Sequence, residues 1–234
     1  PDEAKAAQSE PFKTVQRPVG VQLVDASYFV EEVRRELYSQ FGEQKLYEGG
    51  LSVRTTIDTH LQAIVRRSLR HGLVEYDQRH GFRGAVATLK PGENWQQALE
   101  TQKFADDLAP WTLGVVLDLT PTSVKIGLRP QKLPNGKYST EVKTGTIAFA
   151  DMSWARKSIK DMYLGPVLKQ PSDALAVGDV IYVEPLPSKG AASYGLRQVP
   201  AVNGSVIAMD PHTGRVLAMQ GGFSFDQSEV NRAT

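Results

Sequence analysis

The sequence predicts a mainly β fold of the α+β class. Three observations carry this prediction: helical apolar stripes are confined to the first third of the chain, short β-type runs follow from Arg83 onwards, and an apolar hairpin comes last. The 234 residues are 41% hydrophobic and 23% charged, which is typical of a soluble globular protein with one or two domains.

Charge and composition exclude several classes of protein. The formal net charge of +1 indicates neither a nucleic-acid binder nor an acidic tail, and the lack of cysteine excludes disulfides, thiol nucleophiles and thiolate metal sites. No apolar run reaches the roughly eighteen residues of a membrane span, and no signal peptide is present. Because the chain starts at Pro1 without a methionine, we expect an excised piece of a longer protein.

The N-terminal part predicts a flexible lead and one helix. Residues 1–20 are polar and lack a regular period, so we expect a flexible lead. Asp25 or Ser27 then caps a helix over Tyr28–Phe41, and Gly42 ends it. The i,i+4 stripe of this helix consists of Phe29, Val33, Leu37 and Phe41.

A strand and a second helix complete a predicted linker region over residues 21–83. Leu51–Ile57 alternates and is rich in β-branched residues, which predicts a strand. Asp58 or Thr59 then caps a helix that runs into the Tyr76 region. Its apolar stripe consists of Leu61, Val65, Leu69 and Leu73.

Residues 84–200 predict a small barrel. One short helical stretch, Met152–Ser158, falls between the fourth and fifth of six candidate strands. Without the first strand the order is strand-strand-strand-helix-strand-strand, which is typical of a five-stranded OB-like barrel. The candidate strands are Gly84–Leu89, Leu113–Leu119, Ser123–Leu128, Thr144–Phe149, Asp179–Glu184 and Gly195–Val199.

The last predicted unit, residues 201–234, begins with a β-hairpin. Val206–Met209 and Arg215–Met219 are apolar runs joined by Asp210–Gly214, in which Pro211 and Gly214 favour a turn. Because nearly every strand position is apolar, we expect burial on both faces within a larger sheet. No further strands follow, so we expect the chain to be cut off within a domain.

Several groups of residues resemble functional sites, but their spacing favours a structural role. His60 and His71 lie about 16 Å apart along a helix, too far for one metal ion, and His212 lies in an expected exposed turn. We expect a surface or structural role for these three histidines and for His80. The Gly49-Gly50 and Gly221-Gly222 pairs lack phosphate-loop spacing, and Asp106-Asp107 has no acid or base nearby in sequence. We therefore predict no catalytic, cofactor-binding or metal-binding residue.

Binding of a glycan or nucleic-acid polymer by the barrel is an alternative hypothesis. An OB-like barrel often binds nucleic acid or saccharide on one face. Three tryptophans could stack on sugars, and six arginines lie between Arg54 and Arg83 against only three acids. These residues are Trp95, Trp111 and Trp154, with Arg54, Arg66, Arg67, Arg70, Arg79 and Arg83 against Asp58, Glu75 and Asp77.

The C-terminal residues carry a family resemblance. Asp210-Pro211-His212-Thr213-Gly214, the following Val-Leu-Ala run with Gly221-Gly222, and Asn231-Arg232-Ala233-Thr234 resemble the start of the transpeptidase domain of class A penicillin-binding proteins. Further pieces agree in order with the Gram-negative members, which carry an OB-like insertion: Tyr28–Leu37, Gly49–Gln62, Tyr76–Gly84, Trp154–Lys157, Val177–Val183 and Leu196–Pro200.

Two short motifs mimic the active site of that family. Lys143-Thr144-Gly145 matches a transpeptidase signature and Ser172-Asp173-Ala174 resembles Ser-Asp-Asn. In the family both follow a Ser-x-x-Lys motif, which in turn follows the Asn-Arg-Ala-Thr segment within about ten residues. No Ser-x-x-Lys occurs in this chain, and both matches come too early. We therefore interpret both as parts of the barrel.

The resemblance implies a non-catalytic periplasmic piece of a bifunctional peptidoglycan glycosyltransferase/transpeptidase. It would comprise the linker, the inserted barrel and the first strands of the transpeptidase sheet, without any cofactor. The parent would be anchored in the inner membrane. The implied partners are the other domains of the parent, with a periplasmic regulator or a peptidoglycan strand docking on the surface, and no nucleic acid. The alternative is a stand-alone OB-fold module that binds glycan or nucleic acid.

Overall fold

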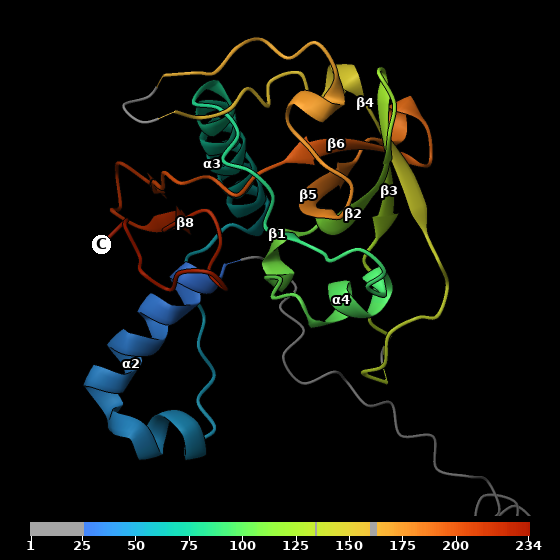
Figure 1. Ribbon diagram of the computed structural model, residues 1–234. Helices are drawn as coiled ribbons and strands as arrows, with labels where there is room; N and C mark the ends of the chain where they lie inside the picture. The colour runs from blue at the N-terminus through green and yellow to red at the C-terminus, as the bar shows by residue number, and fades with distance from the viewer. Residues whose placement is uncertain (1–25, 134, 160–162) are drawn as a thin grey trace, which may run out of the picture.

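The computed structural model describes residues 26–133, 135–159 and 163–234. A β-barrel forms one side of the molecule, helix α3 (Thr59–Arg79) lies beside it, and helix α2 (Ser27–Glu48) projects away from both (Figure 1). The predicted lead over residues 1–20 lies outside the described residues. None of the helices in the described part of the chain is long and apolar enough to cross a membrane.

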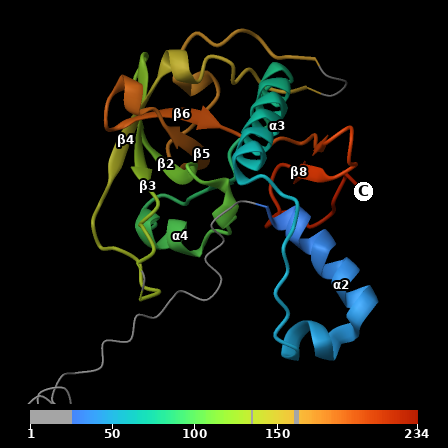
Figure 2. The same cartoon turned by 180° about the vertical axis from the view of Figure 1, so that it is seen from behind.

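Helix α2 is two helical pieces joined at a glycine. Gly42 has φ 75°, outside the helical region, so it ends the first piece as the sequence predicts, and a second piece continues to Glu48. The N-cap is Ala26, which makes no side-chain cap. Only the beginning of the predicted stripe is buried: Phe29 is 7% exposed, whereas Phe41 is 44% exposed. Figure 2 shows α2 projecting away from the barrel.

The predicted strand Leu51–Ile57 is wrong. The segment is extended but joins no sheet, and its side chains are largely exposed. It is tied to strand β8 (Val216–Gln220) only at its end, where Thr56 Oγ1 donates to the Val216 carbonyl at 2.5 Å and Asp58 N donates to that of Leu217 at 2.8 Å. Without a neighbouring strand along its length, β-branched residues alone do not make a ladder.

Helix α3 follows the prediction closely. The Asp58 carboxylate caps it by accepting from the amides of His60 and Leu61, both at 2.9 Å. Its apolar stripe packs toward the hairpin formed by β7 (Val206–Met209) and β8, with Val65 buried. Two polar side chains, Gln62 and Asp77, share the buried face, which the apolar pattern did not predict.

The barrel confirms the predicted fold class. Five strands close on themselves in the order β5-β2-β3-β4-β6, with β6 returning to β5; the β4–β6 pair is parallel and the others are antiparallel. The two-residue β1 is an addition to the β5 edge. The strands are β1 (Ala87–Thr88), β2 (Thr112–Leu119), β3 (Ser123–Leu128), β4 (Thr144–Ala148), β5 (Asp179–Pro185) and β6 (Ser193–Arg197).

Apolar side chains fill the barrel and also cover part of its outside. Ile126, Ile147 and Leu196 are fully buried in the interior. Strand β2 is buried on both faces because helix α4 (Trp95–Thr101) packs against its outer face through Leu99. Asn94 caps α4 by accepting from the amides of Gln96 and Gln97. Asparagine is a common helix N-cap, but α4 was not among the predicted helices.

The predicted helix Met152–Ser158 is also wrong. A 3₁₀ turn, Phe149–Asp151, precedes it, and the chain then turns without forming a helix. Met152 is fully buried in the barrel core, and Ser158 pairs with Leu164. The backbone of this segment forms hydrogen bonds with Phe82 and Gly165 instead of the i,i+4 bonds of a helix.

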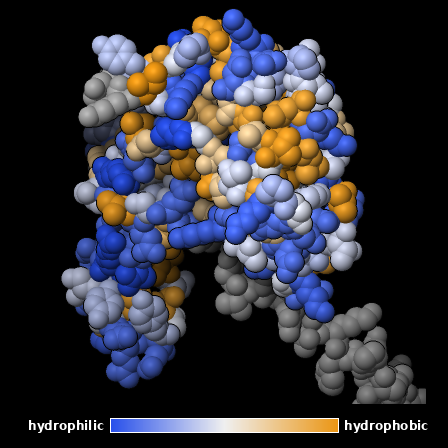
Figure 3. Space-filling view, viewed as in Figure 1, coloured by the Kyte–Doolittle hydropathy of each residue, from blue (hydrophilic) through white to orange (hydrophobic). Residues whose placement is uncertain are grey.

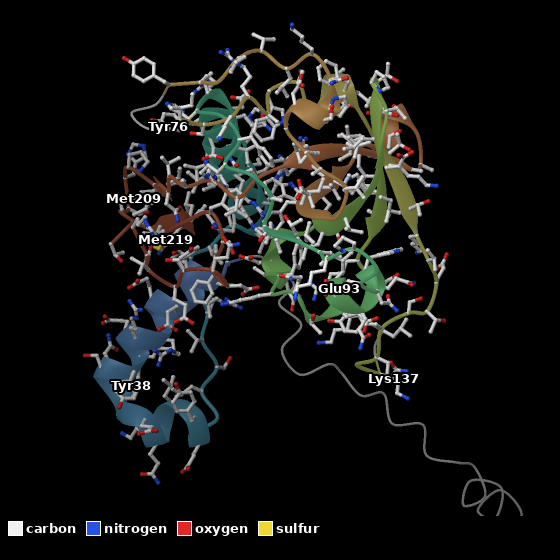
Figure 4. The ribbon with its side chains drawn as sticks, viewed as in Figure 1. Tyr38, Tyr76, Glu93, Lys137, Met209 and Met219 are labelled. Atoms are coloured by element: carbon white, nitrogen blue, oxygen red, sulfur yellow. The ribbon has the colours of Figure 1, made fainter. Side chains whose placement is uncertain are left out.

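The hairpin forms as predicted but is not buried on both faces. Strand β7 (Val206–Met209) pairs with β8 in a two-stranded sheet that packs on α2 and α3. Figure 4 shows Met209 at the outer side of the hairpin and Met219 further inside. The exposed fractions of the two side chains fit these positions: Met209 is 54% exposed and Met219 is 6% exposed. Strand β7 is an edge with no third strand beside it among the described residues.

Candidate functional site

The Lys-Thr-Gly motif lies at the start of strand β4 of the barrel. Lys143 is exposed and pairs with Glu141 at 3.4 Å. Gly145 lies under the ring of Tyr194, and a β-carbon at position 145 would be 2.5 Å from that ring. The glycine is needed because β4 and β6 approach closely here.

Ser172 and Asp173 lie within a single 3₁₀ turn, Pro171–Asp173, whose capping box is formed by Gln170 and Asp173. The Asp173 carboxylate accepts from the amides of Lys169 at 2.6 Å and Gln170 at 3.0 Å. These backbone hydrogen bonds lower the pKa of Asp173. One carboxylate oxygen of Asp173 thus takes part in local structure, which agrees with the interpretation of this motif as part of the barrel.

The four histidines are dispersed. His71 lies 3.8 Å from Glu75 on the exposed face of α3, and His80 Nδ1 bonds with the Tyr76 carbonyl at 2.7 Å. His60 lies at the start of α3 and His212 in the hairpin turn, both exposed. In residues 26–133, 135–159 and 163–234, no three His, Asp or Glu side chains gather as a metal site would require.

The tryptophans serve as packing residues. Trp95 lies against the backbone of Gly127, Trp154 meets Phe82 edge-on with ring centroids 6.0 Å apart, and Trp111 is only 8% exposed. Trp95 and Trp154 are half-buried, and Trp111 also lines a groove between α3 and the barrel.

Asp77 holds together the two places where the chain enters and leaves the barrel. Its carboxylate is 3% exposed and accepts four hydrogen bonds. Arg83 supplies two, at 2.7 and 3.0 Å, Gln198 Nε2 supplies one at 2.7 Å, and the amide of Ala201 supplies one at 3.0 Å. Asp77 falls four residues after Leu73 on the apolar stripe, and a carboxylate on a buried stripe was the signal that could have identified it.

Asp107 forms a second connection, which links the barrel domain to α3 and to the segment after β8. The sequence did not predict these partners. Its carboxylate accepts from Ser224 Oγ at 2.6 Å and from the Phe225 amide at 2.8 Å. Its carbonyl accepts from Arg66 at 2.7 Å and Arg70 at 2.8 Å. One residue of the 3₁₀ turn Asp106–Leu108 therefore bonds both α3 and the segment after β8.

An apolar cluster surrounds this connection. Leu108, Trp111 and Phe223 are its buried members, and Leu73 of α3 and Tyr182 of β5 pack against them. The Arg70 guanidinium also lies 4.8 Å from the centroid of the Phe223 ring. We call the Asp107 bonds together with this cluster the junction. It joins the barrel, α3 and the segment after β8 in one packed unit.

A groove of about 880 Å³ lies next to the junction, between α3 and the barrel. One wall is the arginine-rich face of α3, including Arg67. The other wall is formed by Pro110 and Trp111 and by an ion pair between Arg197 and Glu184 at 2.6 Å. Figure 3 shows apolar side chains gathered over the barrel and mainly hydrophilic ones at the projecting α2.

The chain is similar to penicillin-binding proteins over its whole length. The Penicillin-binding protein OB-like domain family matches residues 82–202, just over half of the chain. Penicillin-binding protein 1A of Rickettsia prowazekii (strain Madrid E) is 36% identical over 90% of this chain and 24% of its own length. That of Vibrio cholerae serotype O1 is 33% identical over 99% of this chain and 27% of its own length.

A solved structure agrees. Penicillin-Binding Protein 1A from Haemophilus influenzae superposes with a TM-score of 0.66 at 27% identity, over all of this chain and 30% of its own. The chain thus spans about a quarter of the length of the curated relatives that it matches. From its barrel and these matches, the chain belongs to the class A penicillin-binding proteins and contains their OB-like domain.

Proposed function

We propose that this chain is a non-catalytic spacer within a bifunctional peptidoglycan glycosyltransferase/transpeptidase on the periplasmic side of the inner membrane. Its divisions are a linker over residues 21–83, the barrel domain over 84–200 and the start of the transpeptidase domain over 201–234. The spacer holds the two catalytic domains at a set separation and offers a docking surface to a periplasmic regulator or a peptidoglycan strand.

The observation that carries this proposal is the double attachment of the barrel. A barrel that is joined to the rest of the chain only by its two chain crossings could rotate about them relative to α3 and the hairpin. Here Asp77 bonds the crossings together, and Asp107 bonds a distant loop of the barrel domain to Ser224. Attachments at separate places restrict rotation in a way that one attachment cannot, which is the property that a spacer requires.

The groove supports the docking part of the proposal. It lies between α3 and the barrel, so a bound partner would contact both the linker region and the inserted domain. The nucleic-acid alternative receives less support, because Arg66 and Arg70 bond the Asp107 carbonyl and Arg83 bonds Asp77. A gel shift that weakens with salt would favour the alternative.

Asp107→Ala tests the spacer role. We expect faster amide exchange at residues 223–226 and a change in Trp111 fluorescence, measured with Trp95 and Trp154 replaced by Phe. Asp106→Ala is the matched control, because Asp106 is the exposed neighbour on the same turn. Equal exchange in both variants would remove the support that the junction gives to the proposal.

Acylation tests the non-catalytic role. Fluorescent penicillin should not label the 234-residue chain, whereas the longer protein that contains it should be labelled. Labelling of the chain itself, abolished by prior heat denaturation, would contradict the proposal.

A further inference from the structure

The side chain of Glu32 on α2 holds the last residues of the chain. Its Oε1 accepts from Asn231 Nδ2 at 2.9 Å and from Thr234 Oγ1 at 3.1 Å. The partners are about two hundred positions away in sequence. Two donors from a four-residue stretch thus meet one carboxylate oxygen in the second turn of α2.

Asn231 is bound on its other side as well. Its Oδ1 accepts from the amide of Ala233 at 3.0 Å, which closes a local turn, and its side chain packs on Gly221 so closely that a β-carbon there would collide with it. The Arg232 amide also donates to the Gly221 carbonyl at 3.1 Å. The Asn-Arg-Ala-Thr segment is therefore packed on the end of β8 and fixed to α2.

Tyr28 extends the same contact by one helical turn. Its hydroxyl lies 3.0 Å from the Ser224 carbonyl and 2.8 Å from that of Ser228, and its ring meets Phe225 edge-on at 5.0 Å. One face of α2 thus contacts the segment after β8 from Ser224 to Thr234.

A role for Glu32 within α2 alone accounts for fewer of its contacts than the anchoring of residues 231–234 does. Glu32 also lies 3.4 Å from Arg35, three residues along the helix, but Arg35 has a closer partner in Glu31 at 3.1 Å. Exposed pairs of this kind contribute little to stability. The bonds to Asn231 and Thr234 are shorter and join distant segments, so they define what Glu32 does.

We propose that Glu32, Asn231 and Thr234 form an anchor that sets the direction in which the chain continues after Thr234. The anchor makes these three residues positioning residues for the acyl-transfer reaction. This inference rests on the proposed function, in which α2 leads from the glycosyltransferase and the segment after Thr234 leads to the acylated serine. Movement of α2 would then change the geometry of the second site.

The first test uses the 234-residue chain and hydrogen exchange. Glu32→Ala should raise exchange of the Arg232 and Ala233 amides about tenfold or more, while Glu32→Gln, which keeps the acceptor oxygen, should stay within about threefold of the wild type. Glu36→Ala is the matched control, because Glu36 lies one turn further along α2 and accepts from Gln40 within the helix. Unchanged exchange in Glu32→Ala would overturn the anchor.

The second test uses the longer protein. Glu32→Ala should slow acylation by fluorescent penicillin about tenfold without slowing glycan polymerisation, and Glu32→Gln should restore the rate. Thr234→Val, which removes one donor, should show a smaller effect of the same kind and serves if Glu32→Ala does not fold.

The outcomes separate the two proposals. Faster exchange with an unchanged acylation rate would overturn the positioning role and leave the anchor in place. A longer protein that penicillin does not label at all would overturn the proposed function, and the positioning role with it.

Discussion

The hydroxyl of Tyr28 occupies the place that a side chain at position 222 would need. A β-carbon built on Gly222 would overlap the Tyr28 oxygen and lie 3.0 Å from Cζ of the same ring. Tyr28 itself is 1% exposed and bonded to two carbonyls, so it has no free space into which to move. The glycine and the tyrosine therefore require each other.

Gly222→Ala should lower the free energy of unfolding by about 1–3 kcal/mol, the usual cost of forcing a methyl group into a packed site. Chemical denaturation monitored by circular dichroism measures the change. Gly72→Ala is the control, because nothing lies within 4 Å of a β-carbon in the middle of α3. It should stabilise the chain by about 0.5–1 kcal/mol, and equal loss in both variants would contradict the explanation.

Tyr28 also predicts a loss of stability at high pH. Burial raises the pKa of Tyr28 to about 12, whereas an unfolded tyrosine loses its proton near pH 10. The folded state therefore has its full advantage below about pH 10 and loses it as the pH rises to about 12, by roughly 2–3 kcal/mol. Denaturant midpoints measured from pH 9 to 12 test this.

Tyr28→Phe should remove that alkaline component and cost about 1–2 kcal/mol at neutral pH through the lost hydrogen bonds. Tyr182, whose pKa burial also raises, is present in both proteins, so the difference between them reports on Tyr28. Tyr47→Phe, at a 62% exposed position, should keep the wild-type pH profile.

Asp77→Ala should destabilise the chain by about 2–4 kcal/mol, because it leaves Arg83, Gln198 and the Ala201 amide without their shared acceptor. Thermal unfolding followed by calorimetry would measure the loss. Glu75→Ala, two residues earlier on the same helix, removes only an exposed partner of His71 and should change stability by less than about 0.5 kcal/mol.

The Lys-Thr-Gly motif predicts opposite results at its two ends. Lys143→Ala in the longer protein should leave penicillin acylation unchanged, because Lys143 belongs to the barrel. Gly145→Ala should lower barrel stability by about 1–3 kcal/mol through its collision with Tyr194. A large loss of acylation in Lys143→Ala with no loss of stability would reverse this interpretation.

Local patterns predicted the barrel well, because β-branched runs and turn residues act over a few positions. Ser123–Leu128 is a strand with the predicted bounds. The same rules failed where tertiary contacts decide: Leu51–Ile57 has strand composition without a partner strand, and the buried Met152 belongs to a segment whose backbone bonds to other parts of the chain.

Local sequence patterns could not predict the long-range hydrogen bonds of Asp107 and Glu32. Asp107 meets Ser224 across 117 positions and Glu32 meets Asn231 across 199. Nothing in the sequence around an exposed-looking aspartate or glutamate marks such a partner. Asp77 is the exception, because its place on an apolar stripe shows that it is buried.

The four bonds of Asp77 have a consequence for how such a protein could have arisen. Since Arg83 and Ala201 bond the same carboxylate, the ends of the barrel lie close together, as they do in domains that tolerate insertion into a host chain. The two crossings of the barrel thus have the geometry of an inserted domain, whereas the Asp107 bonds and the packing of Phe223 tie the surrounding chain to it, so its removal would require changes in α3 and in the segment after β8.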